Sequence, residues 1–429
     1  MTDIAVPDQG VTDVLVVVGQ GYVGLPLAVR AVEQGYRVIG FDVDEAKIAR
    51  LAAGHSPVED ISDVRLGAAL ATGRYLPTSD GAETAGFDAA VISVPTPLHE
   101  GAPDLSYIED AARTLAPGMT PGCCIVLEST TYPGTTEELV QPLLEEGSGL
   151  KAGTDFHLGY SPERIDPGNP RWTFENTPKV VSGIDGPSLK AVTALYDRLV
   201  DQTVPVSSPR EAELTKLLEN TFRHVNIALV NELAMFASDL GIDVWEAIDA
   251  ASTKPFGYLR FTPGPGVGGH CLPIDPSYLS WRVRQSLGAA FRFVELANDV
   301  NDHMPDYVVR RLIAGLNRRR LPVNGQRILL LGLSYKRNTG DARETPSRPI
   351  ARQLLELGGE VLAADPHVRD DLVPPGVTRV ELTPELVASC AAVVVLVDHD
   401  AFDLDVVTAN AAYVLDTRHC LEGDSVEYL

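Results

Sequence analysis

The feature that most constrains the fold of this chain is a glycine-punctuated stretch near its N-terminus. Residues 14–18 (VLVVV) are apolar throughout, as expected of a parallel strand buried on both faces. Three glycines follow in the register GxGxxG: Gly19, Gly21 and Gly24. Apolar residues then recur at helical spacing until Gly35, and a second apolar run, residues 37–41, ends at Asp42. This order of strand, glycine turn, helix and strand predicts the first βαβ unit of a parallel sheet.

The glycine turn also predicts a ligand. In this register the glycines permit a tight turn, close approach of a pyrophosphate and tight helix packing, and the helix N-terminus faces the phosphates. Asp42 lies where a carboxylate accepts hydrogen bonds from an adenosine ribose, and Val43 follows it in place of an arginine. We therefore expect NAD rather than NADP. Lys47 either lies along the ribose or is an ordinary solvated helix lysine.

Three further apolar runs extend the same sheet: residues 87–94, 123–127 and 156–160. Ligands of doubly wound sheets bind beyond the carboxyl ends of the strands. Thr96 and Thr130 follow two of these runs, so we expect them near the nicotinamide half of the cofactor or a water beside it. The third run leads into a loop with Glu163 and Arg164, which suits either a binding loop or a plain surface loop.

Residues 211–240 show helical periodicity, which predicts a helix roughly 45 Å long. Leucines recur along it, so we expect this helix to join two domains and to form the contact of a homodimer. Lys216 and Asn220 are four residues apart and therefore face the same way. Taken alone, Lys216 also fits an ordinary surface lysine.

A glycine- and proline-rich stretch, residues 261–279 (FTPGPGVGGHCLPIDPSYL), contains Cys271. Glycines before the cysteine and prolines after it hold the backbone in a path that another molecule can approach closely. His270 and Asp275 give the thiol polar neighbours that can alter its ionisation. A turn with a half-buried cysteine is the alternative.

A thiol presented in this way fits one kind of oxidation. It can capture an aldehyde as a thiohemiacetal, which NAD oxidises to a thioester, and water then releases an acid. Such a site needs a proton acceptor, donors for an oxyanion and a side chain that holds the water. The groups that can supply these functions are Lys216, Asn220, Thr130, Glu163 and Asp275.

A second α/β region follows. Its expected strands are residues 327–333, 360–364, 391–397 and 413–415, with a helix over 347–357. Only Gly332 remains of a glycine fingerprint, so a second dinucleotide is not expected. Lys336, with Asp341 and Arg343 behind it, suggests a nucleoside diphosphate site, and ion pairs that brace a long loop are the alternative.

Length and composition narrow the function classes. At 429 residues the chain is too long for one core, and its formal charge of −24 disfavours nucleic acid as a partner. The five cysteines lack metal-ligand spacing, which predicts a reduced cytoplasmic chain without a metal. No apolar run is long enough to span a membrane, and the first residues lack a signal-peptide pattern.

The predicted fold class is α/β, with two Rossmann-like doubly wound domains joined by a long central helix. The expected parts are a flexible leader (1–12), an NAD-binding domain (13–205), a central helical dimerisation and catalytic domain (206–320) and a C-terminal Rossmann-like domain (321–429).

These motifs together resemble the nucleotide-sugar 6-dehydrogenases, the UDP-glucose/GDP-mannose dehydrogenase family, over nearly the whole chain. The stretches that carry the resemblance are GQGYVGL, ISVPTP, ESTTYPGTTEE, YSPERIDPGN, ELTKLLENTFRHVNIALVNELA, PGPGVGGHCLPIDPSYL and YKRNTGDARETPS. The resemblance implies that carbon 6 of a nucleotide-diphospho-hexose is oxidised from alcohol to carboxylate with two NAD, and that the C-terminal domain binds UDP.

The resemblance also implies residue roles. Cys271 would be the nucleophile, Lys216 the acid/base and Asn220 the oxyanion donor, with Asp275, Thr130 and Glu163 around the water. The residues implied at NAD are Gly19, Gly21, Tyr22, Val23, Gly24, Asp42, Lys47, Pro95, Thr96, Thr130 and Arg343. Those implied at the sugar nucleotide are Glu163, Arg164, Lys216, Asn220, Arg260, Phe261, Gly264, Gly268 and Lys336.

Two positions depart from the UDP-glucose enzymes. This chain has Pro167 where they commonly carry a second glutamate, and Pro255 where they tend to carry an arginine that reaches across the dimer. Lys254 or Arg260 is left to replace that arginine. The stretches SPERIDPGN and FTPGPGVGGHC look more like the branch acting on UDP-N-acetylglucosamine or UDP-N-acetylmannosamine, with UDP-glucose or dTDP-glucose as the alternative.

Two other functions fit parts of the pattern. A two-electron hydroxyacid dehydrogenase of the 6-phosphogluconate type has a similar cofactor domain and long helix but needs no thiol. A catalytically silent NAD-binding scaffold needs neither the thiol nor Lys216.

Overall fold

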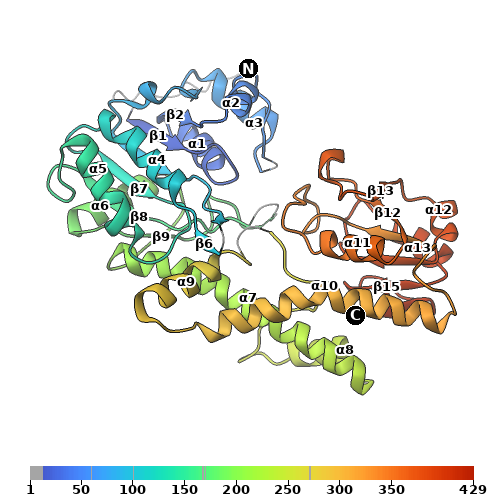
Figure 1. Cartoon of the computed structure of the whole chain (residues 1–429). Coiled ribbons are helices and arrows are strands. Elements are labelled where there is room, and N and C mark those ends of the chain that lie inside the picture. The colour runs from blue at the N-terminus through green and yellow to red at the C-terminus, as the bar shows by residue number, and fades with distance from the viewer. Residues whose placement is uncertain (1–12, 59, 100, 167–168, 170, 270–271) are drawn as a thin grey trace. The chain divides into compact units, whose positions relative to one another are not determined.

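The computed structural model describes residues 13–58, 60–99, 101–166, 169, 171–269 and 272–429. Their backbone divides into two compact units, one ending at Glu219 and the other running from Asn220 to Leu429. Figure 1 shows a sheet with helices packed on it in each unit. No helix in the described ranges combines the length and the apolar character that crossing a membrane requires.

The first unit contains a six-stranded parallel sheet with the order β3-β2-β1-β4-β7-β8. Its strands are β1 (Val14–Val18), β2 (Arg37–Phe41), β3 (Tyr75–Thr78), β4 (Ala89–Ile92), β7 (Cys124–Leu127) and β8 (His157–Tyr160). In the central strand, Val16 pairs with Ile39 on one side and with Ala90 on the other. The chain order reverses at β1, which leaves a switch point at the carboxyl ends of β1 and β4.

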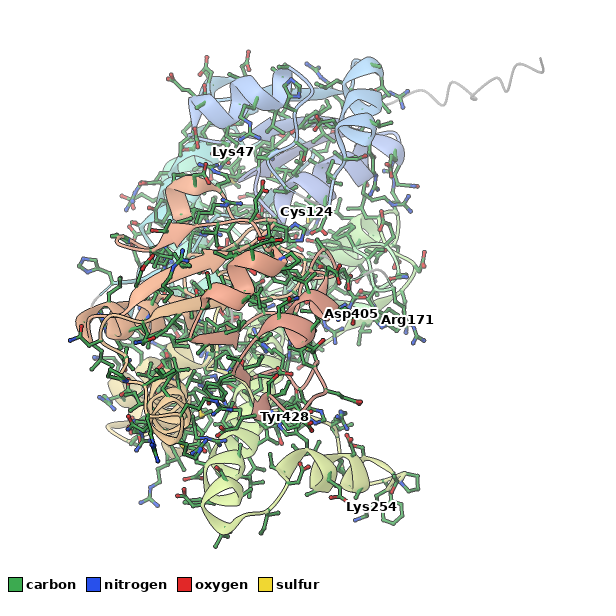
Figure 2. All side chains as sticks on the ribbon, turned by 90° about the vertical axis from the view of Figure 1, so that its right-hand side faces the viewer. Lys47, Cys124, Arg171, Lys254, Asp405 and Tyr428 are labelled. Atoms are coloured by element: carbon green, nitrogen blue, oxygen red, sulfur yellow. The ribbon has the colours of Figure 1, made fainter. Side chains whose placement is uncertain are left out.

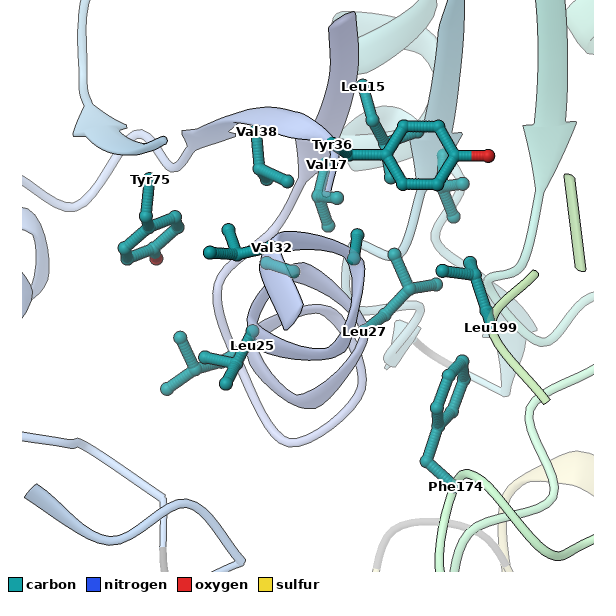
Figure 3. Close-up of a cluster of buried hydrophobic side chains, with 14 of the residues drawn as sticks. Leu15, Val17, Leu25, Leu27, Val32, Tyr36, Val38, Tyr75, Phe174 and Leu199 are labelled. Carbon is teal, nitrogen blue, oxygen red and sulfur yellow. The ribbon is translucent and has the colours of Figure 1, made fainter. Parts of the chain in front are cut away.

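Helices cover both faces of this sheet. Leu15 and Val17 pack against α1 (Gly24–Glu33), α3 (Asp63–Ala71) and α6 (Gly186–Tyr196), and Figure 3 shows part of this cluster around Leu25 and Leu27. Val16 and Val18 point to the opposite face, against α4 (Ser106–Leu115) and α5 (Gln141–Ser148). This unit also contains α2 (Glu45–Ala52), β9 (Lys179–Val181) and β10 (Thr203–Pro205). The continuous apolar run of β1 follows from this burial on both faces.

The second unit repeats the same strand order in the sheet β13-β12-β11-β14-β15-β16. Its strands are β11 (Arg327–Leu331), β12 (Glu360–Ala364), β13 (Thr378–Arg379), β14 (Ala392–Val395), β15 (Val414–Asp416) and β16 (Val426–Tyr428). One face packs against α10 (Arg292–Arg318) and α11 (Ser347–Glu356), and the other against α12 (Pro384–Ser389) and α13 (Leu404–Asn410). The predicted α/β class with two doubly wound domains is thereby confirmed.

The long helix predicted over residues 211–240 is α7 (Pro209–Leu240). Two shorter helices follow it, α8 (Val244–Ser252) and α9 (Asp275–Leu287). The 27-residue helix α10 was not predicted, because Pro305 inside it resembles a helix stop. Cys123 and Cys124 are buried beside or in β7, as expected of strand core.

Candidate functional site

The three glycines of the first turn meet three different surroundings. Gly19 has a positive φ of 91°, and a Cβ there would lie 2.6 Å from the carbonyl oxygen of Ser93. A Cβ on Gly24 would lie 1.9 Å from the carbonyl oxygen of Gly19. A Cβ on Gly21, by contrast, would meet none of the described residues within 4 Å. The first and third glycines therefore close the turn, and the middle one leaves open space above it, as a dinucleotide pyrophosphate requires.

Asp42 follows β2 beside this turn and is buried. Its Oδ2 accepts hydrogen bonds from the Gln20 backbone N–H at 2.8 Å and from Lys47 Nζ at 2.8 Å, and its Oδ1 accepts from the Asp44 N–H. Lys47, marked in Figure 2, is thus ion-paired with Asp42 rather than solvated. The carboxylate is held at the strand end where an adenosine ribose would bind, so the turn and Asp42 together fit NAD.

The segments after β4 and β7 are joined at the sheet edge. Thr96 Oγ1 donates a hydrogen bond to the carbonyl oxygen of Thr130 at 2.8 Å. Pro95 is exposed, and Thr96 and Thr130 are half-buried, as are Tyr22 and Val23 of the glycine turn. The structure therefore brings Thr96 and Thr130 together on the side where the switch point lies.

The first turns of α7 hold the loop that contains Thr130. Glu213 is fully buried, and its carboxylate accepts hydrogen bonds from the Gly134 N–H at 2.6 Å and from the N–H and hydroxyl of Thr136. Burial raises the pKa of Glu213 to about 7, although these hydrogen bonds act in the opposite direction. Glu213 was not predicted from the sequence, where its signal is a carboxylate three residues before Lys216 on one helix face.

The same helix holds the loop with Glu163. Lys216 is only 7% exposed, and its Nζ donates a hydrogen bond to the Glu163 carbonyl oxygen at 2.6 Å. Arg164 Nη2 donates to Glu219 Oε1 at 2.7 Å and its Nη1 donates to the Pro178 carbonyl oxygen. The reading of Lys216 as a surface lysine is therefore wrong.

Behind Glu163 lies a buried cluster that the sequence analysis did not find. Lys179 Nζ forms a short ion pair with Glu128 Oε1 and lies 3.6 Å from Glu163 Oε2. Tyr196 donates its hydroxyl hydrogen to Glu128 Oε2 at 3.0 Å. All four side chains are buried. They come from the ends of β7 and α6, the start of β9 and the loop after β8, so no local pattern links them.

In the second unit, α7 organises the stretch that leads toward Cys271. Asn220 is buried one turn beyond Lys216, and its Nδ2 donates a hydrogen bond to Asp275 Oδ2 at the start of α9. Asn231 Oδ1 accepts a hydrogen bond from the Gly264 N–H at 2.9 Å. Cys271 and His270 themselves lie outside the described residues.

The glycines before Cys271 pack closely on the loop after β11. A Cβ on Gly268 would lie 2.4 Å from the carbonyl oxygen of Glu344, and the Gly269 N–H donates to the same oxygen at 2.8 Å. That loop carries Lys336 and Arg343, so the structure brings Gly268 close to the loop of Lys336 within one unit.

Other predicted residues have local partners. Arg343 forms an ion pair with Asp341 at 2.9 Å, so the loop is braced as the alternative reading proposed. Arg260 pairs with Asp249 at 2.5 Å. Phe261 meets Phe222 edge-on with ring centroids 5.8 Å apart.

Lys254, marked in Figure 2, is exposed and lies with Nζ 5.0 Å from the centre of the Phe256 ring. Arg418 was not predicted. Its Nε donates to the Leu396 carbonyl oxygen at 2.6 Å, and its Nη1 would lie 3.2 Å from a Cβ on Gly264. Arg418 is therefore a cation beside Gly264, which is predicted to bind the sugar nucleotide.

The turn after β11 copies the backbone pattern of the turn after β1. Gly332 has a φ of 87°, and the Leu333 N–H donates to Asp365 Oδ2 at 2.7 Å, as the Gln20 N–H does to Asp42. Each oxygen of Asp365 accepts from two backbone N–H groups, whereas each oxygen of Asp42 accepts from one, and Asp365 Oδ2 also lies 3.1 Å from His399 Nε2. The Asp365 carboxylate is therefore more fully occupied by internal partners than the Asp42 carboxylate, which leaves it less able to accept from a ribose.

Comparison with known proteins gives matches over most of the chain. Residues 14–200 match the NAD binding domain of the UDP-glucose/GDP-mannose dehydrogenase family, residues 210–303 its central domain and residues 329–423 its UDP binding domain. The UDP-N-acetyl-D-mannosamine dehydrogenase of Pyrococcus horikoshii is 35% identical over 90% of each chain. The UDP-N-acetyl-D-glucosamine 6-dehydrogenase of Pseudomonas aeruginosa is 38% identical over 85% of this chain and 86% of its own.

A solved structure agrees with the sequence matches. The structure of UDP-D-ManNAc dehydrogenase from Pyrococcus horikoshii superposes with a TM-score of 0.88 at 32% identity, covering 97% of this chain and 98% of that one. The expected NAD cofactor and the class of NAD-dependent nucleotide-sugar dehydrogenase are thereby confirmed. The fold, the glycine turn and the matched domains show that the chain belongs to the UDP-glucose/GDP-mannose dehydrogenase family.

Proposed function

We propose that the protein oxidises carbon 6 of a UDP-N-acetylhexosamine to the carboxylate, using two NAD and a covalent intermediate on Cys271. The observation that carries the proposal is on α7. Lys216 is buried and bonded to the Glu163 loop, and Asn220, one turn later, is bonded to Asp275. In a nucleotide-sugar dehydrogenase, a buried lysine and amide in this register are groups suited to proton transfer and oxyanion binding.

The proposed roles follow from these contacts. The glycine turn and Asp42 would hold NAD, which would supply the hydride acceptor for each oxidation. Lys216 takes the proton of the substrate hydroxyl, and Asn220 donates to the developing oxyanion while Asp275 fixes the Asn220 amide in place. Glu163 and Thr130 lie in the two loops held by α7 and orient the water that releases the product. We assign residues 13–205 to NAD, 206–320 to catalysis and dimerisation, and 321–429 to the UDP moiety, with Gly264, Gly268 and Lys336 nearest it.

The acetylated sugar is favoured by the relatives. The two curated relatives described above are named for UDP-N-acetyl-D-mannosamine and UDP-N-acetyl-D-glucosamine. Because Arg260 is paired with Asp249, we propose Lys254 as the cation that replaces the arginine missing at Pro255. We keep the cytoplasm as the proposed compartment, since Cys123, Cys124, Cys390 and Cys420 are free thiols.

We also propose a homodimer through α7, because large apolar side chains lie on its exposed side. Its buried side combines polar residues (Glu213, Lys216, Asn220, Thr221, His224 and Asn231) with apolar ones (Ala212, Leu217, Ala228, Val230, Ala234 and Ala237). Its exposed side is apolar, with Leu214, Leu218, Phe222, Leu229, Leu233 and Phe236. Leu218 alone is 63% exposed, and a contiguous apolar stripe of this kind is typical of an interface. A second copy supplies the same stripe about a twofold axis. Leu218→Glu should convert the dimer to a monomer in sedimentation velocity, and an unchanged dimer would refute this interface.

Stoichiometry tests the main proposal. With UDP-N-acetylmannosamine or UDP-N-acetylglucosamine we expect about two NADH per sugar consumed, one for each oxidation. One NADH per sugar would indicate a hydroxyacid-type enzyme. A silent scaffold would form no NADH with these two sugars, nor with UDP-glucose, dTDP-glucose or GDP-mannose. Cys271→Ser should stop net formation of the acid, whereas full activity of this variant would exclude the thioester route.

A further inference from the structure

The cluster behind Glu163 has one cation between two carboxylates. Glu128 and Tyr196 have no exposed surface, and Lys179 is nearly as buried. Lys179 Nζ contacts Glu128 directly and Glu163 at 3.6 Å, while the Tyr196 hydroxyl donates to Glu128. The Lys179 ammonium also lies 5.2 Å from the centre of the Tyr196 ring. One positive charge is therefore shared by two negative ones.

Such an arrangement is not needed for stability. A buried ion pair costs desolvation that its Coulomb attraction only partly offsets, and a second buried carboxylate adds repulsion. Lys179 and Glu128 alone would make a complete pair, with Tyr196 filling a further hydrogen bond. Burial raises the pKa of Glu128, the Lys179 charge lowers it and the Glu163 charge raises it again. Glu128 is thus sensitive to the charge on Glu163.

The network ends on a carboxylate oxygen that lacks a hydrogen-bond donor among the described residues. Glu163 Oε2 is buried and accepts no hydrogen bond from the described residues. The other oxygen, Oε1, accepts from the Ile165 N–H. A buried carboxylate oxygen of this kind normally binds a hydrogen-bond donor, and water is the smallest one available.

The other charges that face this loop are already engaged. Lys216 on α7 donates to the Glu163 carbonyl oxygen, and Arg164 is paired with Glu219 and bonded to the Pro178 carbonyl oxygen. Glu163 Oε2 is left with Lys179 as its ion-pair partner and, through it, with Glu128.

We propose that Glu128, Lys179 and Tyr196 are positioning residues that set the charge and orientation of the Glu163 carboxylate in the step that releases the product. This inference rests on the proposed function. In that step water adds to the thioester carbonyl carbon, one water proton passes to Glu163, and the carbon–sulfur bond breaks to free the Cys271 thiolate. The acid that forms then ionises in solution. With Glu128, Glu163 and Lys179 ionised and Tyr196 neutral, the cluster carries one net negative charge, which favours uptake of the proton.

The test uses opposite charge changes in the full-length protein. In Glu128→Gln, Lys179 has only Glu163 to neutralise, so Glu163 becomes a weaker base. The acid limb of kcat against pH should move down by about one pH unit, and kcat on the plateau should fall by about threefold or more while KM changes little. In Lys179→Met both carboxylates lose their cation, so the acid limb should move up by about one pH unit. A merely structural role has no reason to move the limb in opposite directions.

Milder substitutions test the same inference if Glu128→Gln or Lys179→Met does not fold. Lys179→Arg should restore the wild-type limb, and Tyr196→Phe, which removes one donor to Glu128, should shift it downward by less than Glu128→Gln. Tyr413→Phe is the matched control, because Tyr413 is a buried tyrosine that donates to Glu427 in the second unit at 3.2 Å. It should leave the limb unchanged.

Intact-mass analysis of acid-quenched enzyme turning over UDP-N-acetylmannosamine or UDP-N-acetylglucosamine gives a second readout. The acyl adduct should be more abundant in Glu128→Gln than in wild type. Limbs that stay in place in Glu128→Gln, Lys179→Met and Tyr196→Phe, or that move the same way in the first two, would overturn the inference while two NADH per sugar still supported the proposed function. A wild type that forms no NADH would remove the proposed function itself.

Discussion

We predict that two neighbouring substitutions in the glycine turn impair the protein for different reasons, one through its stability and the other through its affinity for NAD. Gly21→Ala and Gly24→Ala each add one methyl group to the same turn. At Gly24 the new Cβ would lie 1.9 Å from the Gly19 carbonyl oxygen and 2.5 Å from Ser93 Oγ. At Gly21 the new Cβ would touch none of the described residues, and neither position has a positive φ.

The magnitudes follow from these distances. In Gly24→Ala the turn and α1 must separate by more than 1 Å, and such overpacking costs about 1–3 kcal/mol, with the upper end expected because the obstacle is backbone. The gain in helix propensity from glycine to alanine is about 1 kcal/mol at most and does not offset it. For a unit of this size the melting temperature should fall by roughly 4 °C or more. Gly21→Ala should melt within about 1 °C of wild type.

Affinity for NAD separates the two variants. The open space above Gly21 is where the pyrophosphate would approach, so the methyl group of Gly21→Ala should weaken NAD binding by about tenfold or more, which corresponds to about 1.4 kcal/mol. Thermal unfolding of the full-length protein and titration with NAD by isothermal calorimetry measure the two effects. Gly21→Ala with normal NAD affinity, or with the larger loss of stability, would refute the reasoning.

Three further predictions follow from buried charges. Lys216→Ala should reduce kcat by at least about a hundredfold with little change in KM, because the Lys216 amine accepts the substrate proton in the transition state; equal losses in kcat and in sugar affinity would contradict this. Burial raises the pKa of Glu213 from 4.5 to about 7, so ionising Glu213 destabilises the folded wild type as the pH rises between these values. The melting temperature of Glu213→Gln, measured relative to wild type, should therefore rise from pH 5 to pH 7. A difference that does not change with pH would refute this prediction. Against burial, hydrogen bonds from His399 and from backbone N–H groups hold the pKa of Asp365 well below its usual range, so it stabilises the fold above about pH 4 and that contribution is lost as pH falls; Asp365→Asn should lower the melting temperature at pH 7 and bring it closer to wild type near pH 3.

Several features of the site could be predicted because they depend on the spacing of residues that are close together in the sequence. The glycines, Asp42 and the apolar runs around them lie within one βαβ unit, and the chemistry of that unit depends on spacing along the chain. Lys216 and Asn220 share one face of α7 because a helix has 3.6 residues per turn. The burial of Lys216 could not be predicted, because a lysine has the same sequence neighbours whether its helix face is covered or not.

The amino-acid sequence by itself determined the two βαβ sheets, the long helix between them and the identity of the groups near the cofactor turn. These depend on hydrophobic period and on backbone freedom, which act between residues close together in the chain. Only the tertiary structure decided which charges are buried. Lys179 and Glu128 are 51 residues apart and Tyr196 is 68 residues from Glu128, and they meet because β7, β9 and α6 pack together. Desolvation depends on that packing and not on spacing along the chain, so the sequence does not distinguish these buried side chains from solvated ones.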